Sequence, residues 1–251
     1  MSSLGDASII KHMAEHSSVP VLPAQVEYLL PGCNALETSL VLGQCWTHNG
    51  KPYMLIDTVK YVLETLDKNQ VPYAVIGGLA VSHHAVPRLT QDVDLIVPAE
   101  SMGRIRSLFP NCYQRGTAVV EVYDIDGTRV DFLPAKLRYE REVVAHAVPG
   151  AIGGILAKIA SVRDLLLLKM FSAGSRPVLG DRKQDEADIT RLLEINMENI
   201  TPEQIRYIAD RMLELCFTAE DRARTVSQLH WLNDILVQLN MADRCYPLDK
   251  K

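Results

Sequence analysis

Three aspartates carry the clearest chemical signal in this 251-residue sequence: Asp92, Asp94 and Asp131. Asp92 and Asp94 are two positions apart in the run DVDLIVP, so on a β-strand both side chains leave the same face. Asp131 is flanked by two apolar residues in the run TRVDFLP and would likewise point away from them. If the two strands are neighbours, three carboxylates converge on one patch of a sheet.

A cluster of carboxylates on a sheet favours a divalent cation. Two like charges 4 Å apart repel by about 4 kcal/mol at an effective dielectric constant near 20, so a compensating ion gives a reason to gather them. Oxygen-only ligands are typical of Mg²⁺ or Mn²⁺. Two aspartates on a strand can also simply face solvent. The residue types around them indicate which interpretation applies.

A glycine pair, Gly77 and Gly78, precedes the first two aspartates by one predicted helix and a loop. The pair follows the apolar run VPYAVI, where glycines would let backbone N–H groups approach a phosphate at a helix N-terminus. A tight turn is the alternative. Arg88 and Thr90 lie in the loop before Asp92, and we expect them either to meet a phosphate or to cap and brace the loop.

The elements that position these residues predict an α+β fold: a mixed sheet flanked by helices, followed by a C-terminal helical subdomain. Apolar spacing indicates a helix from Asp57, and strands are expected in VPYAVIGG, DVDLIVP, TAVVEVYDI and TRVDFLP. Asp126-Gly127 separates the last two strands and is typical of a two-residue hairpin turn. Residues 139–160 are expected to be extended, with a turn at PGAIGG.

The C-terminal part of the chain has helical periodicity in four segments, VRDLLLLKMFSAG, RKQDEADITRLLEI, TPEQIRYIADRMLELC and AEDRARTVSQLHWLNDILVQL. Thr201 and Pro202 suit the N-cap and first position of the third helix. We therefore divide the chain into an N-terminal extension of unclear structure (1–56), a catalytic core (57–160) and a helical subdomain (161–251).

The composition excludes several classes of protein. Hydrophobic residues at 47% and charged residues at 23% are typical of a globular chain, and a net charge of −5 excludes a strongly basic nucleic-acid coat protein. No run approaches the roughly 18 consecutive apolar residues of a membrane span, and the N-terminus lacks a signal peptide, so we expect a cytoplasmic protein. Five scattered cysteines without a CxxC argue against a disulfide framework or a zinc knuckle.

The run GGLAVSHHAVPRLTQDVDL, followed by VDFLP, resembles the DNA polymerase β-like nucleotidyltransferase superfamily. The pattern of that superfamily is a strand, GG or GS, a short helix, then DxD, with a third Asp on a neighbouring strand. The Arg-x-Thr-x-Asp-x-Asp-Leu run at 88–95 looks most like the AbiEii/AbiGii-type group, some of whose members are toxins of toxin–antitoxin pairs. The resemblance covers residues 57–195.

A second block, SVRDLLLLKMFSAG and RKQDEADITRLL, is similar to the family's helix with a central lysine and the basic, Asp-containing helix that follows it. The resemblance maps five residues onto these two helices: Lys169, Arg182, Lys183, Asp185 and Asp188. Of these, it implies that Lys169, Arg182 and Lys183 contact the nucleotide. Relatives carry a lysine immediately before the first aspartate of that helix, whereas Gln184 holds this place here. Residues 158–183 also contain six cations and two anions, which would form either a counter-field for a triphosphate or a solvated helix face.

The resemblance implies a nucleotidyltransferase that uses Mg²⁺ or Mn²⁺ to move an NMP from an NTP such as ATP to a hydroxyl acceptor. Asp92, Asp94 and Asp131 would hold the metal, Asp131 would also orient or deprotonate the acceptor, and Gly77 and Gly78 would approach the triphosphate. Kinship suggests RNA, such as a tRNA end, as the acceptor and an antitoxin as a partner. A small hydroxylated molecule of the aminoglycoside type is the alternative acceptor, and a non-catalytic NTP-binding or antitoxin-like module is the alternative function.

Overall fold

The computed structural model describes the following residues: 47–48, 51–52, 55–86, 88, 90–175 and 178–248. Most of the predicted N-terminal extension lies outside the described residues, as does Arg176, one of the six cations counted above. Two short strands at the start of the described part, β1 (Thr47–His48) and β2 (Lys51–Pro52), pair antiparallel with each other.

The main sheet has seven strands in the order β5-β6-β7-β4-β3-β9-β8. Their bounds are β3 (Ala74–Ile76), β4 (Asp92–Pro98), β5 (Tyr113–Gly116), β6 (Glu121–Ile125), β7 (Thr128–Ala135), β8 (Val148–Ile152) and β9 (Ile155–Ile159). The sheet is mixed, because β4 pairs in parallel with β7 and antiparallel with β3, which in turn pairs in parallel with β9. A mixed sheet with a helical C-terminal part confirms the predicted α+β class.

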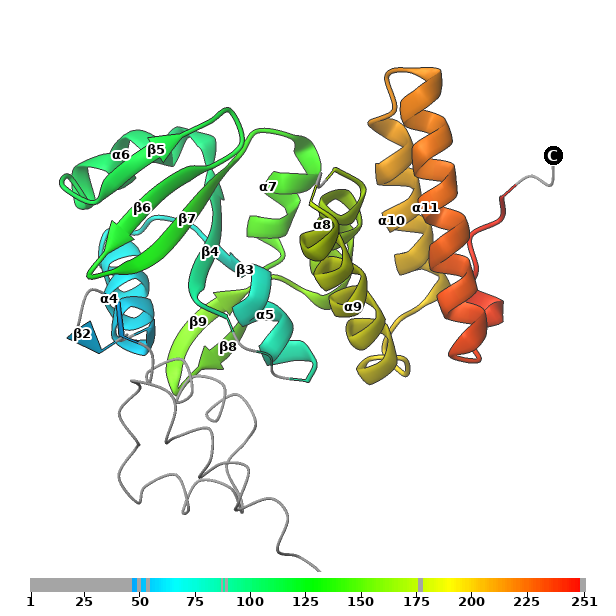
Figure 1. The fold of residues 1–251 in the computed structure, drawn as a ribbon, viewed down its shortest axis with the longest axis horizontal. Coiled ribbons are helices and arrows are strands. Elements are labelled where there is room, and N and C mark those ends of the chain that lie inside the picture. Colours follow the sequence, from blue (N-terminus) through cyan, green and yellow to red (C-terminus); the bar gives the residue numbers. More distant parts are fainter. Residues whose placement is uncertain are drawn as a thin grey trace, which may run out of the picture.

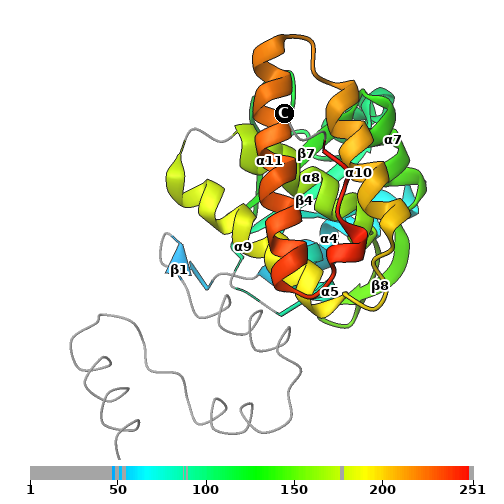
Figure 2. The ribbon, with the colours of Figure 1, turned by 90° about the vertical axis from the view of Figure 1, so that its right-hand side faces the viewer.

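Helices surround this sheet and then continue without strands to the C-terminal end of the described chain. They are α4 (Leu55–Lys68), α5 (Gly77–His84), α6 (Met102–Leu108), α7 (Arg138–Ala145), α8 (Val162–Ser175), α9 (Leu179–Ile195), α10 (Pro202–Glu214) and α11 (Ala219–Gln238), with 3-10 turns η1 (Ala99–Ser101) and η2 (Ala242–Arg244). Figure 1 shows α8 and α9 between the sheet and the α10–α11 pair. In Figure 2, which looks onto this helical end of the molecule, α11 lies in front. None of the helices in the described ranges combines the length and apolar character that a bilayer span requires.

The two faces of the sheet differ in character around β4 and β7. Val93, between the two aspartates, and Leu95, directly after the second, are fully buried on the other face of β4, as the alternation predicts. Phe132 of β7 stacks against Phe109, which follows α6, at a centroid distance of 5.9 Å, and Phe109 meets Tyr61 of α4 edge to face. The helices α4 and α6 therefore cover the apolar face, and the aspartates point to the opposite face.

Two hairpins of the sheet turn through residue pairs with positive φ. Asp126 (φ 53°) and Gly127 (φ 82°) join β6 to β7, which confirms the two-residue turn predicted from the Asp-Gly pair. Gly153 (φ 56°) and Gly154 (φ 80°) join β8 to β9 and form the turn expected within PGAIGG. The first of these turns sets the antiparallel register of β6 and β7.

The prediction that residues 139–160 are extended is wrong at its start, because residues 138–145 form α7. Glu140 accepts a hydrogen bond of 2.8 Å from the backbone N–H of Leu137 and so caps the first turn, while Val143 is fully buried. Strand β5 was also not predicted. All four of its residues are exposed at the sheet edge, so no hydrophobic alternation marks it.

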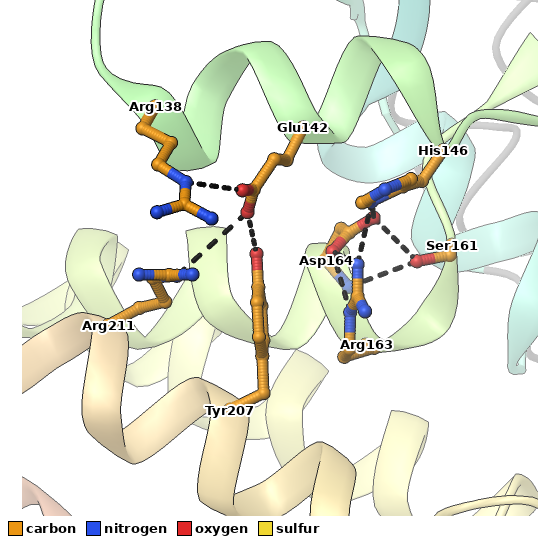
Figure 3. A network of polar contacts seen from close by, with 8 residues as sticks. All are labelled: Arg138, Glu142, His146, Ser161, Arg163, Asp164, Tyr207 and Arg211. Carbon is orange, nitrogen blue, oxygen red and sulfur yellow. Dashed lines mark hydrogen bonds and ion pairs between the residues drawn. The ribbon is translucent and has the colours of Figure 1, made fainter.

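A polar network joins α7, α8 and α10 (Figure 3), and its members are Arg138, Glu142, His146, Ser161, Arg163, Asp164, Tyr207 and Arg211. Tyr207 of α10 donates a hydrogen bond of 2.5 Å to Glu142 of α7, and the Arg163 guanidinium lies 4.2 Å from the centroid of the Tyr207 ring. The fully buried Asp164 accepts hydrogen bonds from Arg163 Nε (2.9 Å) and Ser161 Oγ (2.8 Å). These contacts hold the helical part against the sheet part.

Candidate active site

The three aspartates predicted from the sequence lie on adjacent parallel strands. Asp94 of β4 is the register partner of Asp131 of β7, and Asp92 lies two residues earlier on the same strand face as Asp94. All three side chains line one cleft of about 570 Å³, whose opposite wall is made by α8 and α9. The structure therefore brings the three carboxylates together at a single cleft.

Two of these carboxylates have hydrogen-bond partners of their own. Thr90 Oγ1 donates to Asp92 Oδ1 at 2.9 Å, so Thr90 braces the first aspartate. Arg129 donates two hydrogen bonds to Asp131, from Nε to Oδ1 at 2.8 Å and from Nη2 to Oδ2 at 2.5 Å. Paired N–H donors of this kind hold a carboxylate in one orientation.

Asp94 sits at the centre of the cluster and carries its electrostatic cost. Burial, reinforced by the negative charges of Asp92 and Asp131, raises the pKa of Asp94 to about 7. The positive charges of Lys169 and Arg129 act in the opposite direction but do not cancel this effect. Clustered carboxylates with an upward-shifted pKa are typical of functional sites, because a structural role does not require them.

The glycine pair begins α5 directly after β3, with Gly77 in close contact with Asp94. Gly77 has φ +63°, and a Cβ placed on it would lie 1.9 Å from Asp94 Oδ2. A Cβ on Gly78 would lie 2.6 Å from Thr90 Oγ1. Both glycines and Ile76 line the cleft, so backbone at the N-terminal end of α5 is presented to it. Glycine is required at position 77 for both the left-handed φ and the close approach, and at position 78 for the close approach.

Lys169 and Arg88 reach the cleft from opposite sides and meet at one buried carboxylate. Lys169 Nζ lies 2.7 Å from Asp185 Oδ1 and 2.8 Å from Asp188 Oδ2. Arg88 Nε lies 3.0 Å from Asp188 Oδ1, and Gln184 donates to the same oxygen at 3.0 Å. Asp188 is fully buried. This cluster ties the loop before Asp92 to α8 and α9, so Arg88 braces the loop in this structure.

The remaining nucleotide-site predictions, Arg182 and Lys183, lie away from the cleft. Both are exposed on α9 and pair with Glu186, at 3.3 Å for Arg182 Nε and 2.6 Å for Lys183 Nζ. Of the six cations counted between residues 158 and 183, Lys169 is the one in the described part of the chain that lines the cleft. The count of cations along the sequence overestimated the positive charge that faces the cleft, because successive helix residues point in different directions.

Sequence reasoning missed Arg129, which lines the cleft beside Asp131. The available signal was its position two residues before Asp131 on a predicted strand, which places both side chains on one face. It also missed an apolar part of the lining, formed by Val119, Val120 and Leu133. Val120 immediately precedes β6, and Leu133 lies on β7 two residues after Asp131, so only the pairing of these strands reveals the patch.

The aspartates suit a hard divalent cation in the chemistry of their donor atoms. Three carboxylates supply oxygen ligands only, and a cation would offset the negative charges of Asp92 and Asp131 that, after burial, raise the pKa of Asp94. In the described residues, no group of three or more His, Cys, Asp or Glu side chains is already close enough to enclose a metal ion. Arg129 occupies both oxygens of Asp131, so a cation at the trio would have to take over part of that pairing.

No protein-family model matches the chain, and no curated protein matches it significantly. Solved structures with a similar fold include the antibiotic-resistance factor ANT(2'')-Ia in solution, with 16% identity, 73% of this chain and 97% of that chain covered, and a TM-score of 0.49. The crystal structure of ANT(2")-Ia in complex with adenylyl-2"-tobramycin is also 16% identical, with 69% of this chain and 97% of that chain covered and a TM-score of 0.49.

An antigenic nucleotidyltransferase-like protein from Paracoccidioides brasiliensis is 17% identical, with 74% of this chain and 91% of that chain covered and a TM-score of 0.48. These similar structures are nucleotidyltransferases or proteins described as like them. Because the TM-scores lie below 0.5, the function of this chain has to be argued from the geometry of its own cleft.

Proposed function

We propose that this protein is a nucleotidyltransferase that transfers an NMP from a metal-bound NTP to a hydroxyl group. One observation carries the proposal: Asp92, Asp94 and Asp131 line one cleft from two adjacent parallel strands, directly beneath the glycine turn that begins α5. A carboxylate cluster needs a cation, and exposed N–H groups at a helix N-terminus suit an anion. A triphosphate that carries Mg²⁺ supplies both charges in one ligand.

Each residue of the cleft has a role in this proposal. Asp92, Asp94 and Asp131 hold the cation, and bound Mg²⁺ or Mn²⁺ would activate the acceptor oxygen and stabilise the departing pyrophosphate. Gly77 and Gly78 allow the triphosphate to approach the backbone N–H groups of α5. Asp131, on the strand next to the first two aspartates, orients the acceptor hydroxyl and receives its proton.

Lys169 and Thr90 support these groups from outside the carboxylate trio. Lys169 places a positive charge within electrostatic reach of Asp94 and faces the cleft, where it would attract the triphosphate. Thr90 keeps Asp92 turned toward the cleft through its hydrogen bond. The transfer itself then depends mainly on positioning and on charge stabilisation, as is usual for phosphoryl chemistry.

A small hydroxylated acceptor is favoured over RNA by the lining of the cleft. A polyanionic acceptor binds through a track of cations. The described lining holds three cations, Arg88, Arg129 and Lys169, each of which pairs with a carboxylate. It also has an apolar part formed by Val119, Val120 and Leu133. Arg182 and Lys183, expected to extend a basic field, pair with Glu186 outside the cleft. An apolar wall next to the attacking hydroxyl suits the carbon face of a ring.

The test is incubation with each α-labelled NTP, Mg²⁺ and either a set of small hydroxylated compounds or total cellular RNA. We expect pyrophosphate release and transfer of label to a small compound, at a rate that depends weakly on salt. Asp94→Asn should abolish transfer, whereas Asp234→Asn on the exposed side of α11 should not. Full activity of Asp94→Asn would contradict the enzymatic proposal, as would Mg-NTP binding without pyrophosphate release. Label that moves only to RNA would contradict the small acceptor.

A further inference from the structure

Arg129 stands in an unusual relation to the carboxylate cluster. It lies two residues before Asp131 on β7, so both side chains emerge on the cleft face of the same strand. Its guanidinium makes both hydrogen bonds to Asp131, while half of its side-chain surface remains exposed. Asp131 itself is only 6% exposed. The arginine therefore covers its carboxylate from the solvent side.

The charge of Arg129 acts on the whole cluster and not on Asp131 alone. Asp92 and Asp94 both lie within electrostatic reach of the guanidinium. The other cations in the described lining, Arg88 and Lys169, pair with Asp188 of α9. Of the described lining cations, Arg129 is thus the one that bonds directly to a member of the trio.

The Arg129–Asp131 pair contributes little to the stability of the fold. Arg129 and Asp131 belong to one strand, so their contact joins no two elements of the fold. The exposure of the arginine lets water screen the pair, and such pairs contribute little to the free energy of unfolding. The pair also occupies both oxygens that a cation at Asp131 would use. Its main physical consequence therefore falls on what binds to the trio.

We infer that Arg129 is a resident counter-cation, which competes with the divalent metal for Asp131 and lowers the affinity of the free enzyme for that metal. The inference rests on the proposed function, since it concerns the same three aspartates. A metal ion that arrives alone must displace a positive charge held by two hydrogen bonds. A metal ion that arrives with a triphosphate brings phosphate oxygens, which are alternative acceptors for the freed guanidinium.

The test measures Mn²⁺ binding to the full chain without nucleotide at constant ionic strength. The electron paramagnetic resonance signal of free Mn²⁺ reports how much of the ion remains unbound. Removing one positive charge beside three carboxylates should tighten Mn²⁺ binding by about tenfold in Arg129→Gln, allowing for solvent screening. Arg129→Lys keeps the charge but loses the paired N–H donors, so its Mn²⁺ affinity should lie between those of wild type and Arg129→Gln. Arg138→Gln removes a comparable arginine, paired with Glu142 on α7, and should leave Mn²⁺ binding unchanged.

The outcomes separate this inference from the proposed function. If wild type binds Mn²⁺, Asp94→Asn does not, and Arg129→Gln binds no tighter than wild type, the counter-cation role is overturned and the metal site stands. If neither wild type nor Arg129→Gln binds Mn²⁺ without nucleotide, the counter-cation role is overturned, whereas the proposed function is judged separately by pyrophosphate release from Mg-NTP. Thermal unfolding would verify that the variants are folded. If Arg129→Gln does not fold, Arg129→Met, which keeps the length of the aliphatic chain, takes its place.

Discussion

Gly77 and Asp94 are in such close contact that a single added carbon atom would collide with the carboxylate. A Cβ on Gly77 would lie 1.9 Å from Asp94 Oδ2 and 2.8 Å from Asp94 Cβ. The turn that begins α5 is therefore seated on the central carboxylate of the cleft. This contact couples the surface proposed for the triphosphate to the groups proposed for the metal, and neither can shift without moving the other.

Gly77→Ala should therefore impair transfer far more than it impairs folding. The methyl group would displace Asp94 or the turn, and a shift of about 1 Å at reacting groups can reduce the rate about 100-fold. The left-handed φ of +63° adds a strain of about 1–2 kcal/mol for alanine. Transfer kinetics and thermal unfolding measure the two effects. Gly103→Ala is the matched control, because a Cβ there meets no atom within 4 Å; loss of activity in that variant would remove the argument.

Thr90→Val should reduce transfer by about 10–100-fold, because it removes the hydroxyl that donates to Asp92 Oδ1 while preserving the shape of the side chain. A hydrogen bond to a charged group contributes about 1.5–3 kcal/mol, and the site would lose it directly at a proposed metal-binding carboxylate. Steady-state kinetics of transfer measure this. Thr90→Ser retains the hydroxyl and should retain most activity. Equal rates for the valine variant and wild type would mean that Asp92 does not need this brace.

Asp188→Ala should destabilise the fold by about 3 kcal/mol, because it removes the carboxylate shared by the buried Lys169 and the partly buried Arg88. The loss lies at the low end for a broken buried ion pair, since Lys169 keeps its contact with Asp185. Denaturant unfolding measures the change in the free energy of unfolding. Glu194→Ala, on an exposed position of the same helix, should change that free energy by less than about 0.5 kcal/mol. A similarly small effect for Asp188→Ala would show that the cluster does not hold α8 and α9 to the loop.

Glu121 should make the unfolding free energy fall in acid. The hydrogen bond from Arg106, more than any other contact, lowers the pKa of Glu121 below its ordinary value of 4.5, and Tyr123 also donates to this carboxylate. The unfolded chain therefore binds the proton more readily, and the stabilising contribution is present above pH 4.5 and lost as the pH falls below it. Glu121→Gln and Arg106→Gln should both flatten this part of the pH dependence of unfolding. An unchanged acid limb in both variants would contradict the assignment.

The sequence alone was sufficient for the parts of the fold that depend on local signals. The alternation around Asp92 and Asp94, the Asp126-Gly127 turn and the Thr201 cap each act through neighbours only a few residues away, and each has the predicted structure. Helix α7 and strand β5 were harder to predict. The first is capped by Glu140 within a segment otherwise marked by proline and glycine, and the second is an exposed edge without an apolar pattern.

The order of residues along the chain determined which side chains could hold a cation, since aspartates at spacing two on a strand must share a face. It could not determine which cations would face them. Lys169, Arg182 and Lys183 are close in sequence, yet Lys169 alone of these three lines the cleft, because a helix turns its successive residues in different directions. The spacing of two along one strand places Arg129 on the same face as Asp131, but its position opposite Asp92 follows only from the pairing of β4 with β7. Charge compensation acts across distances in space, and the pairing of strands and the packing of helices set those distances.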